Sequence, residues 1–328
     1  MIKNLILCFL ISLVFSVVLG VLIIPLLKRL KAGQPILKYV KEHGAKQGTP
    51  TMGGVFIVIS SIISYFIFRG FSGIIAVMTI CIGLAYMLVG FLDDFLKIKR
   101  KENEGLSVMQ KILFQTAIAT MAGFFAYLNK MSVIFLPFSN KLINLDVFII
   151  PFNAIVFIAI TNSVNLTDGL DGLASGTSVF YLLAFAILIC LQINFFKGLY
   201  TLKDEYYNLV FLSIAIVGSL VGFLLFNINP AKVFMGDTGS LSLGGFIGAI
   251  TLFSMNALYM PIIGICFVFS SLSVVIQVAV YKKTKRRVFL MAPFHHHLQH
   301  KGISENRISF IYSLITVIMG VFVIIFYL

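Results

Sequence analysis

The residues best suited to chemistry are acids in three clusters and a run of histidines, each placed between apolar stretches of the chain. They are Asp93-Asp94, Asp168 and Asp171, Asp237, and His295-His296-His297. Carboxylates are the oxygen ligands that Mg²⁺ takes in proteins, usually together with substrate phosphates and water. Imidazoles bind metals or, when protonated, phosphate. If the fold brings these groups together, they predict a polar site for metal and phosphate chemistry.

Asp93 and Asp94 follow directly after an apolar stretch that ends near residue 92. Carboxylates at a helix C-terminus oppose the helix dipole, so simple capping explains this pair poorly. Two adjacent carboxylates can raise each other's pKa, which suits one of them to act as a base. The alternative is a solvated charge pair, balanced by the basic residues that follow at 97–101.

Four polar residues, Asn162, Asn165, Asp168 and Asp171, are spaced by three. On a helical turn, residues three apart share a face, so these side chains can converge. Asp and Asn also favour helix N-caps, and a capped start of the next helix is the alternative interpretation. Capping accounts for one of the four residues only.

Asp237 is a weak signal alone, because an Asp before an apolar stretch is a common N-cap. As a third carboxylate on the same face of a membrane, it becomes a candidate metal ligand. Phe234, three residues earlier, could stack on a nucleotide base or simply pack.

The histidines at 295–297 lie inside the chain, where an exposed surface run is the alternative interpretation. Lys46 precedes a flexible turn at Pro50–Gly54, and this arrangement suits phosphate contact. It is not a Walker loop, because the GxxxxGK pattern is absent from the sequence.

Composition restricts the fold that must position these groups. The chain is 59% hydrophobic and 11% charged, with a mean hydropathy of +1.04, a balance that excludes a soluble globular protein. Ten apolar stretches lie near 5–24, 52–68, 74–92, 112–128, 147–161, 176–196, 207–226, 240–256, 260–281 and 308–327. A membrane-crossing helix needs roughly 20 apolar residues. We therefore expect an all-α integral membrane protein of about ten transmembrane helices, with residues 1–328 forming one polytopic domain.

The basic residues predict the orientation. Of the 25 Lys and Arg residues, 19 fall in the loops 25–51, 93–111, 162–175, 227–239 and 282–307. The other six are Lys3, Arg69, Lys130, Lys141, Lys197 and Lys203. Because cytoplasmic loops are rich in Lys and Arg, the first set is predicted to be cytoplasmic and to form the active site. Both termini then lie on the periplasmic or extracellular side.

Transport is the competing function class, because many polytopic membrane proteins carry solutes. Ionisable residues in mid-membrane would favour it, and the ten stretches contain no Asp, Glu, Lys or Arg. Two glycine pairs, Gly218 with Gly222 and Gly244 with Gly248, predict close helix packing instead of a functional role. The four cysteines all lie in apolar stretches and form no CxxC motif, so neither disulfides nor a zinc site are expected.

The motifs together resemble the bacterial phospho-N-acetylmuramoyl-pentapeptide-transferase family. The segments that carry the resemblance, in order, are Lys46–Gly54, Asp93-Asp94, Asn162–Leu173, Phe234–Ser240 and Met291–His297. The wider polyprenyl-phosphate N-acetylhexosamine-1-phosphate transferases share the aspartate clusters. Residues 50–54 and the three histidines favour the muramoyl branch.

The resemblance implies a ten-span enzyme of the bacterial inner membrane, often a homodimer, with a cytoplasmic site. It would transfer phospho-N-acetylmuramoyl-pentapeptide from UDP to undecaprenyl phosphate, giving UMP and lipid I for peptidoglycan synthesis, with Mg²⁺ as cofactor. Its partners would be these two substrates and membrane lipid, and no nucleic acid is implied. The alternative is a related enzyme that transfers N-acetylglucosamine 1-phosphate to the same lipid.

The resemblance also assigns roles by position. The catalytic residues would be Asp93, Asp94, Asp168, Asp237 and His295, with Asp93 activating the lipid phosphate. The metal ligands would be Asp237 and Asp168. The substrate-binding residues would be Lys46, Thr51, Asn165, Asp168, Asp171, Asn227, Phe234, Gln277, Ala292, His296 and His297, with Phe234 stacking on uracil. Two positions depart from the family pattern, since Gln299 and Ser270 stand where members usually carry Glu.

Overall fold

Helices account for all the apolar stretches that the sequence predicts. The computed structural model describes residues 1–29, 48–100, 104–139, 141–193 and 200–327. The stretches correspond to α1 (Ile2–Arg29), α2 (Gly54–Arg69), α3 (Ile74–Arg100), α4 (Val108–Leu128), α5 (Ile149–Thr167), α6 (Leu173–Gln192), α7 (Tyr200–Asn227), α8 (Gly236–Phe253), α9 with α10 (Met260–Ile263 and Ile265–Thr284) and α12 (Glu305–Tyr327). The protein is thus an all-α membrane protein.

Eight of the helices in the described ranges are long and apolar enough to cross a membrane: α1, α3, α4, α5, α6, α7, α10 and α12. The 16-residue α2 is apolar but shorter. The eighth apolar stretch folds as the 18-residue α8, which begins with the polar residues Gly236-Asp237-Thr238. The number of ten spans therefore stays a prediction, whereas the helical identity of each stretch is confirmed.

Helix α8 forms the centre of the bundle. Every residue from Thr238 to Phe253 is buried, and α3, α5 and α2 pack around it. Its glycines allow α5 to come close: a Cβ on Gly244 would lie 2.6 Å from the Cα of Thr161, and one on Gly248 would lie 2.9 Å from the ring of Phe157. The predicted packing role of this glycine pair is confirmed.

The second glycine pair joins α7 to α1. A Cβ on Gly222 would lie 2.8 Å from the carbonyl oxygen of Leu13 in α1. Beside it, the Ser16 hydroxyl donates a hydrogen bond of 2.7 Å to the carbonyl of Ser219. Small residues let two backbones approach, and a hydroxyl hydrogen bond between helices adds to their association in an apolar medium.

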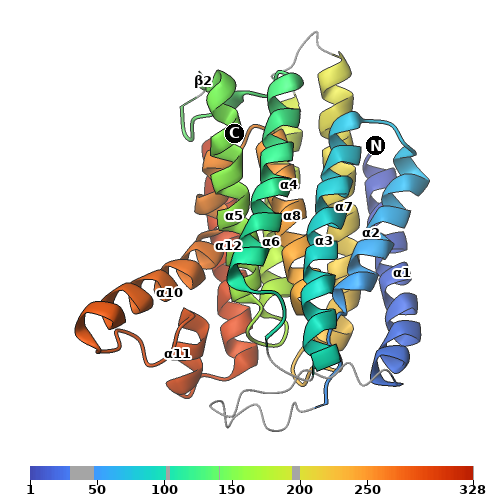
Figure 1. Ribbon diagram of the computed structural model, residues 1–328. Coiled ribbons are helices and arrows are strands. Elements are labelled where there is room, and N and C mark those ends of the chain that lie inside the picture. The colour runs from blue at the N-terminus through green and yellow to red at the C-terminus, as the bar shows by residue number, and fades with distance from the viewer. Residues whose placement is uncertain (30–47, 101–103, 140, 194–199, 328) are drawn as a thin grey trace.

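The apolar stretch 260–281 is not one continuous helix. It breaks at Gly264, where a Cβ would lie 2.8 Å from the Met260 carbonyl and 3.1 Å from the ring of Tyr181. After this break α10 leaves the bundle, and it projects to one side together with the short α11 (Phe294–His300), as Figure 1 shows. This helix pair positions the three histidines.

The two chain termini lie at one end of the bundle, and α11 lies towards the other (Figure 1). The strands β1 (Val133–Phe135) and β2 (Leu142–Asn144) pair antiparallel in the loop between α4 and α5. At the start of α3, the Glu205 carboxylate accepts hydrogen bonds of 2.9 and 3.1 Å from the backbone N–H groups of Ile74 and Ile75. A carboxylate at this position satisfies the free N–H groups of the helix and complements its dipole.

Candidate active site

The Asp93-Asp94 pair does not end its helix, contrary to the prediction. Helix α3 continues to Arg100 and ends in basic residues, which suit the negative end of the helix dipole. Lys97 lies one turn after Asp93, and its Nζ is 2.7 Å from Asp93 Oδ2. Both aspartates are buried. The extra helical turns therefore place a lysine directly over the carboxylates.

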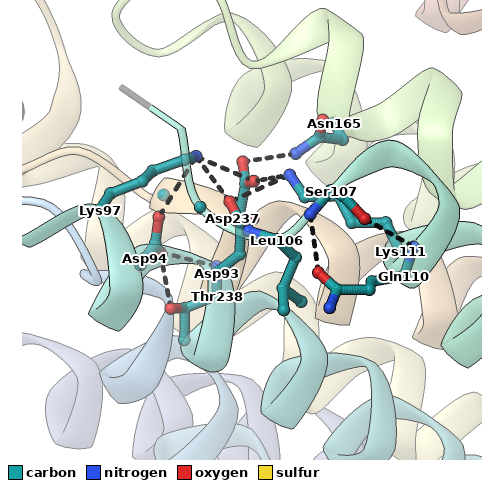
Figure 2. A network of polar contacts seen from close by, with 12 residues as sticks. Asp93, Asp94, Lys97, Leu106, Ser107, Gln110, Lys111, Asn165, Asp237 and Thr238 are labelled. Carbon is teal, nitrogen blue, oxygen red and sulfur yellow. Dashed lines mark hydrogen bonds and ion pairs between the residues drawn. The ribbon is translucent and has the colours of Figure 1, made fainter. Parts of the chain in front are cut away.

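Three carboxylates and two ammonium groups form the centre of the site (Figure 2). Asp237, in the first turn of α8, has its Oδ2 3.1 Å from Lys97 Nζ and 2.8 Å from Lys111 Nζ. The ammonium of Lys111, in the first turn of α4, also lies 3.0 Å from Asp93 Oδ2. Asn165, near the end of α5, donates a hydrogen bond of 2.9 Å to Asp237 Oδ1. Four helices thus contribute to one polar cluster.

Asp94 is held by the first turn of α8. Its Oδ2 accepts hydrogen bonds from the backbone N–H and the hydroxyl of Thr238, at 2.9 and 2.7 Å. The turn begins at Gly236, whose φ is +72° and whose Cβ, if present, would lie 2.5 Å from Asp94 Oδ2. Among the described residues, the other oxygen, Asp94 Oδ1, is buried without a hydrogen-bond partner, and the Lys97 ammonium lies 4.0 Å from it.

The cluster has the donor set of a hard divalent cation. Asp93, Asp94 and Asp237 each offer a carboxylate oxygen, and these oxygens lie within 4.8 Å of one another. Mg²⁺ prefers such oxygen ligands, and the unpartnered Asp94 Oδ1 is a ready acceptor. As ionised groups, three carboxylates against two lysines leave one negative charge. The residues therefore fit a metal ion, and Asp168 is not one of the three.

Residues 50–54 lie against the loop that precedes α8. The Phe234 N–H donates to the Pro50 carbonyl at 2.8 Å, and the Gly53 N–H donates to the Phe234 carbonyl at 2.9 Å. This pairing buries Thr51 beside Gly236, and the Thr51 hydroxyl has no hydrogen-bond partner in the described part of the chain. Thr51 and Phe234 are thus brought to the edge of the acidic cluster, while Lys46 lies outside the described residues.

Asp168 lies at the C-cap of α5, on the same side of the molecule as the cluster. Burial raises the pKa of Asp168 well above its usual range, and the negative charges of Asp237, Asp94 and Asp171 add to this effect. A strongly perturbed pKa of this kind is common at functional sites. Of the four residues spaced by three, Asn165 thus contacts Asp237 directly, and Asp168 lies near enough to the cluster to be affected by its charges.

Asp171 and Asn227 connect two loops of the site. Asp171 Oδ2 accepts hydrogen bonds from the Asn229 side chain and the Ala231 N–H, at 3.0 and 3.1 Å. Asn227 accepts a hydrogen bond of 3.1 Å from the Gly172 N–H and donates one of 3.0 Å to the Val233 carbonyl. Both buried side chains therefore fix the turn after Asp168 against the loop that leads to Asp237.

The three histidines have different surroundings. His295 is fully buried, and both ring nitrogens lack a hydrogen-bond partner in the described part of the chain. Burial, with a smaller effect from His296, holds the pKa of His295 well below its usual range. His295 and His296 both lie against Gly169, next to Asp168. His297 instead packs on Phe294, with ring centroids 5.5 Å apart.

Gln277 and Ala292 belong to the projecting part of the molecule. The Gln277 side chain on α10 accepts hydrogen bonds of 3.0 Å from the N–H groups of Val288 and Phe289. Ala292 lies two residues before α11, next to its N-cap Pro293. Both residues thus lie with His297 in the α10–α11 segment, apart from the acidic cluster.

The sequence did not single out three residues whose side chains contact the carboxylates, namely Lys97, Lys111 and Thr238. It also did not single out Ser240, which accepts a hydrogen bond from Asn165. The contact of Lys97 could have been predicted, because Lys97 comes four residues after Asp93 and therefore lies on the same helical face. Lys111 is the one charged residue of α4, an unusual position at the start of an apolar helix. Nothing in the sequence distinguishes Thr238 and Ser240 from the polar residues that commonly occur at the start of a helix.

Comparison with known proteins gives one consistent family. Residues 74–255 match glycosyl transferase family 4, and residues 46–58 match phospho-N-acetylmuramoyl-pentapeptide-transferase signature 1. The chain is 42% identical over 313 residues to the phospho-N-acetylmuramoyl-pentapeptide-transferase of Clostridium novyi (strain NT), covering 94% of this chain and 93% of that protein. It is 41% identical to that of Clostridium perfringens (strain 13 / Type A), with 94% of each chain covered, and 40% identical to that of Clostridioides difficile (strain 630), with 95% and 94% covered.

Proposed function

Because this chain belongs to the phospho-N-acetylmuramoyl-pentapeptide-transferase family, we propose that the acidic cluster is the site of phosphoryl transfer from UDP-N-acetylmuramoyl-pentapeptide to undecaprenyl phosphate. The product, lipid I, is a precursor of peptidoglycan, and UMP is released. The observation that carries the proposal is that Asp93, Asp94 and Asp237 converge with Lys97 and Lys111. They do so in a chain that is 42% identical to a member of this family over 94% of its length.

The reaction forms one bond and breaks one. Overall, a bond forms between an oxygen of the lipid phosphate and the phosphorus attached to the sugar, and the bond from that phosphorus to the UMP oxygen breaks. Because both reactants carry phosphate charge, catalysis consists mainly of positioning and charge neutralisation. Lys97 and Lys111 supply two positive charges at the point where Asp93 and Asp237 meet, so they are suited to hold phosphate oxygens. Asp93 receives the role of activating the lipid phosphate.

Asp237, Asp93 and Asp94 would together hold Mg²⁺. When bound, the ion would neutralise part of the negative charge of the pyrophosphate. Asp168 is the second metal ligand that the family resemblance suggests. Thr238 and Asn165 orient the carboxylates through their hydrogen bonds.

The remaining family residues would bind the nucleotide and the sugar-peptide. Phe234 would stack on uracil at the edge of the cluster. The others are Lys46, Thr51, Asp171, Asn227, Gln277, Ala292, His295, His296 and His297.

We also propose that the site lies on the cytoplasmic side of the bacterial inner membrane, where the predicted cytoplasmic loops of a single membrane domain form it. We propose that the enzyme works as a homodimer. The excess of Lys and Arg in those loops supports this orientation.

The test is UMP release by the purified protein from UDP-N-acetylmuramoyl-pentapeptide, with and without undecaprenyl phosphate and Mg²⁺. We expect release only when lipid and metal are both present. Asp237→Asn should lower turnover by at least about 100-fold, the scale seen when a charge that stabilises the transition state is removed. Release that is independent of Mg²⁺ would remove the metal site from the mechanism.

UDP-N-acetylglucosamine serves as the parallel substrate. If the protein releases UMP from it alone, the chain is the related N-acetylglucosamine-1-phosphate transferase instead. The folded state of each variant is checked by size-exclusion chromatography in detergent, so that an inactive but folded Asp237→Asn protein is distinguished from a misfolded one.

A further inference from the structure

The backbone at Gly105 and Leu106, which precedes α4, lies directly against Asp93. The Leu106 N–H donates a hydrogen bond of 2.7 Å to Asp93 Oδ1 (Figure 2). The other oxygen, Asp93 Oδ2, lies 2.7 Å from Lys97 Nζ and 3.0 Å from Lys111 Nζ. The two oxygens of this carboxylate therefore have different surroundings, because Oδ1 faces the backbone and Oδ2 faces the two ammonium groups.

The absence of a side chain at Gly105 allows this close approach. A Cβ on Gly105 would lie 2.6 Å from the backbone oxygen of Asp93 and 2.7 Å from its Cγ. Favourable contacts between nonbonded carbon atoms are about 3.5–4.0 Å long, so the two segments would have to move apart by roughly 1 Å. Because one contact is with the backbone of α3, rotation of the Asp93 side chain cannot relieve it. The φ of Gly105 is not positive, so space and not backbone conformation requires the glycine.

Hydrogen bonds hold this segment on both sides. Towards α3, Arg100 Nη1 donates a hydrogen bond of 3.3 Å to the Gly105 carbonyl. Towards α4, the Ser107 N–H donates to Gln110 Oε1 at 2.9 Å, and the Gln110 N–H donates to Ser107 Oγ at 3.2 Å. This reciprocal pair is a capping box, which fixes where a helix begins. It therefore also fixes the first turn of α4, which carries Lys111.

We propose that Gly105 and Leu106 are positioning residues that select Oδ2 as the oxygen with which Asp93 acts in the reaction. The Leu106 N–H holds Oδ1, so Oδ2 is directed towards the two lysines that are suited to hold phosphate. The last torsion of an aspartate is broad and roughly two-fold, so without this hydrogen bond the two oxygens could exchange places. The role in the reaction rests on the proposed function, whereas the contact is a property of the protein alone.

Hydrogen–deuterium exchange tests the contact without substrate or metal. Exchange of the Leu106 amide is followed by mass spectrometry of overlapping peptides from the detergent-solubilised protein. We expect exchange at least about tenfold faster in Asp93→Ala, which removes the acceptor of a charge-assisted hydrogen bond. Asp93→Asn is the matched control, because it keeps an oxygen that can accept and should stay within about threefold of the unmodified protein. Equal exchange in Asp93→Ala and the unmodified protein would overturn the proposal.

Gly105→Ala tests the effect on the reaction. We expect kcat for UMP release to fall about 100-fold, the effect of moving a catalytic group by about 1 Å. The KM for UDP-N-acetylmuramoyl-pentapeptide should change less than about threefold, because a group that acts in the transition state lowers kcat and kcat/KM together. Glu104→Ala is the matched control, since Glu104 is the exposed neighbour of Gly105 and its loss should leave turnover within about twofold. A folded Gly105→Ala protein as active as this control would overturn the positioning role.

Ser107→Ala is a milder variant, which gives a result even if Gly105→Ala does not fold. It removes one hydrogen bond of the capping box, so we expect kcat to fall about fivefold, and Ser107→Thr to restore it. An unchanged kcat in Ser107→Ala would overturn the positioning role of this segment.

The proposed function and this inference fail in different ways. If the unmodified protein releases UMP from no UDP-sugar, the proposed function fails, and with it the role in the reaction, while the contact measured by exchange stands. If the unmodified protein releases UMP and Gly105→Ala is as active as Glu104→Ala, the inference fails and the proposed function stands.

Discussion

Thr238 supplies both hydrogen bonds that the structure gives to the Asp94 carboxylate, one from its backbone and one from its hydroxyl. Thr238→Val removes the hydroxyl and keeps the side-chain shape. A hydrogen bond to a charged group contributes about 1.5–3 kcal/mol, so we expect turnover measured by UMP release to fall at least about tenfold. Thr238→Ser keeps the donor and should stay within about twofold of the unmodified enzyme. Equal activity of the two variants would show that the hydroxyl does not orient Asp94.

His295 makes stability depend on pH, because burial holds its pKa well below the ordinary value. The unfolded chain then binds a proton that the folded chain excludes, so stability falls as the pH drops below about 6.5. Through this one group, the free energy of unfolding changes by at most about 1.4 kcal/mol per pH unit. We expect thermal unfolding in detergent to show a smaller loss of Tm between about pH 7.5 and 5.5 for His295→Gln than for the unmodified protein. Parallel pH profiles would contradict this.

At the scale of elements, the turn into α8 brings the site together, and its conformation depends on Gly236. A Cβ there would meet Asp94 and Thr51, and the φ of +72° is unfavourable for other residues. We therefore expect Gly236→Ala to lower turnover by about 100-fold or more. Gly302→Ala is the matched control, because Gly302 has a φ of +84° but open space around it. This control should cost only about 1 kcal/mol of stability. Equal losses in both variants would mean that backbone strain, and not the contact with Asp94, causes the defect.

The elements also show what the sequence could predict. Hydropathy located the helices because the bilayer sets their length, and the glycine pairs located two close helix contacts. It could not predict that α3 continues to Arg100 or that Gly264 breaks a helix, because packing against other elements decides both. The sequence was enough to pick out the aspartates of the acidic cluster, because their residue type and their positions between apolar stretches are visible in it. The role of Lys111 was not, since it depends on how α4 packs against α3.

For the whole molecule, the distribution of basic residues and the path of the chain predict the same orientation in the membrane. The two termini lie at one end of the bundle and α11 lies towards the other (Figure 1), which agrees with the even number of crossings that the sequence predicts. Because Lys and Arg are concentrated in the sequence segments 25–51, 93–111 and 282–307, we expect the end of the bundle that carries the acidic cluster to face the cytoplasm. Alkaline phosphatase needs disulfides and is active only outside the cytoplasm, whereas green fluorescent protein reports the inside.

A phosphatase fused to the C-terminus should therefore be active, and one fused after Arg287, beyond the end of α10, should be inactive. Green fluorescent protein at the same two points should give the opposite result. An active phosphatase after Arg287 would place α11 and its histidines outside the cell, where a UDP-linked substrate made in the cytoplasm could not reach them. The orientation is thus a condition for the chemistry as well as a consequence of the charges, because the site must meet a soluble nucleotide and a lipid phosphate at the same membrane surface.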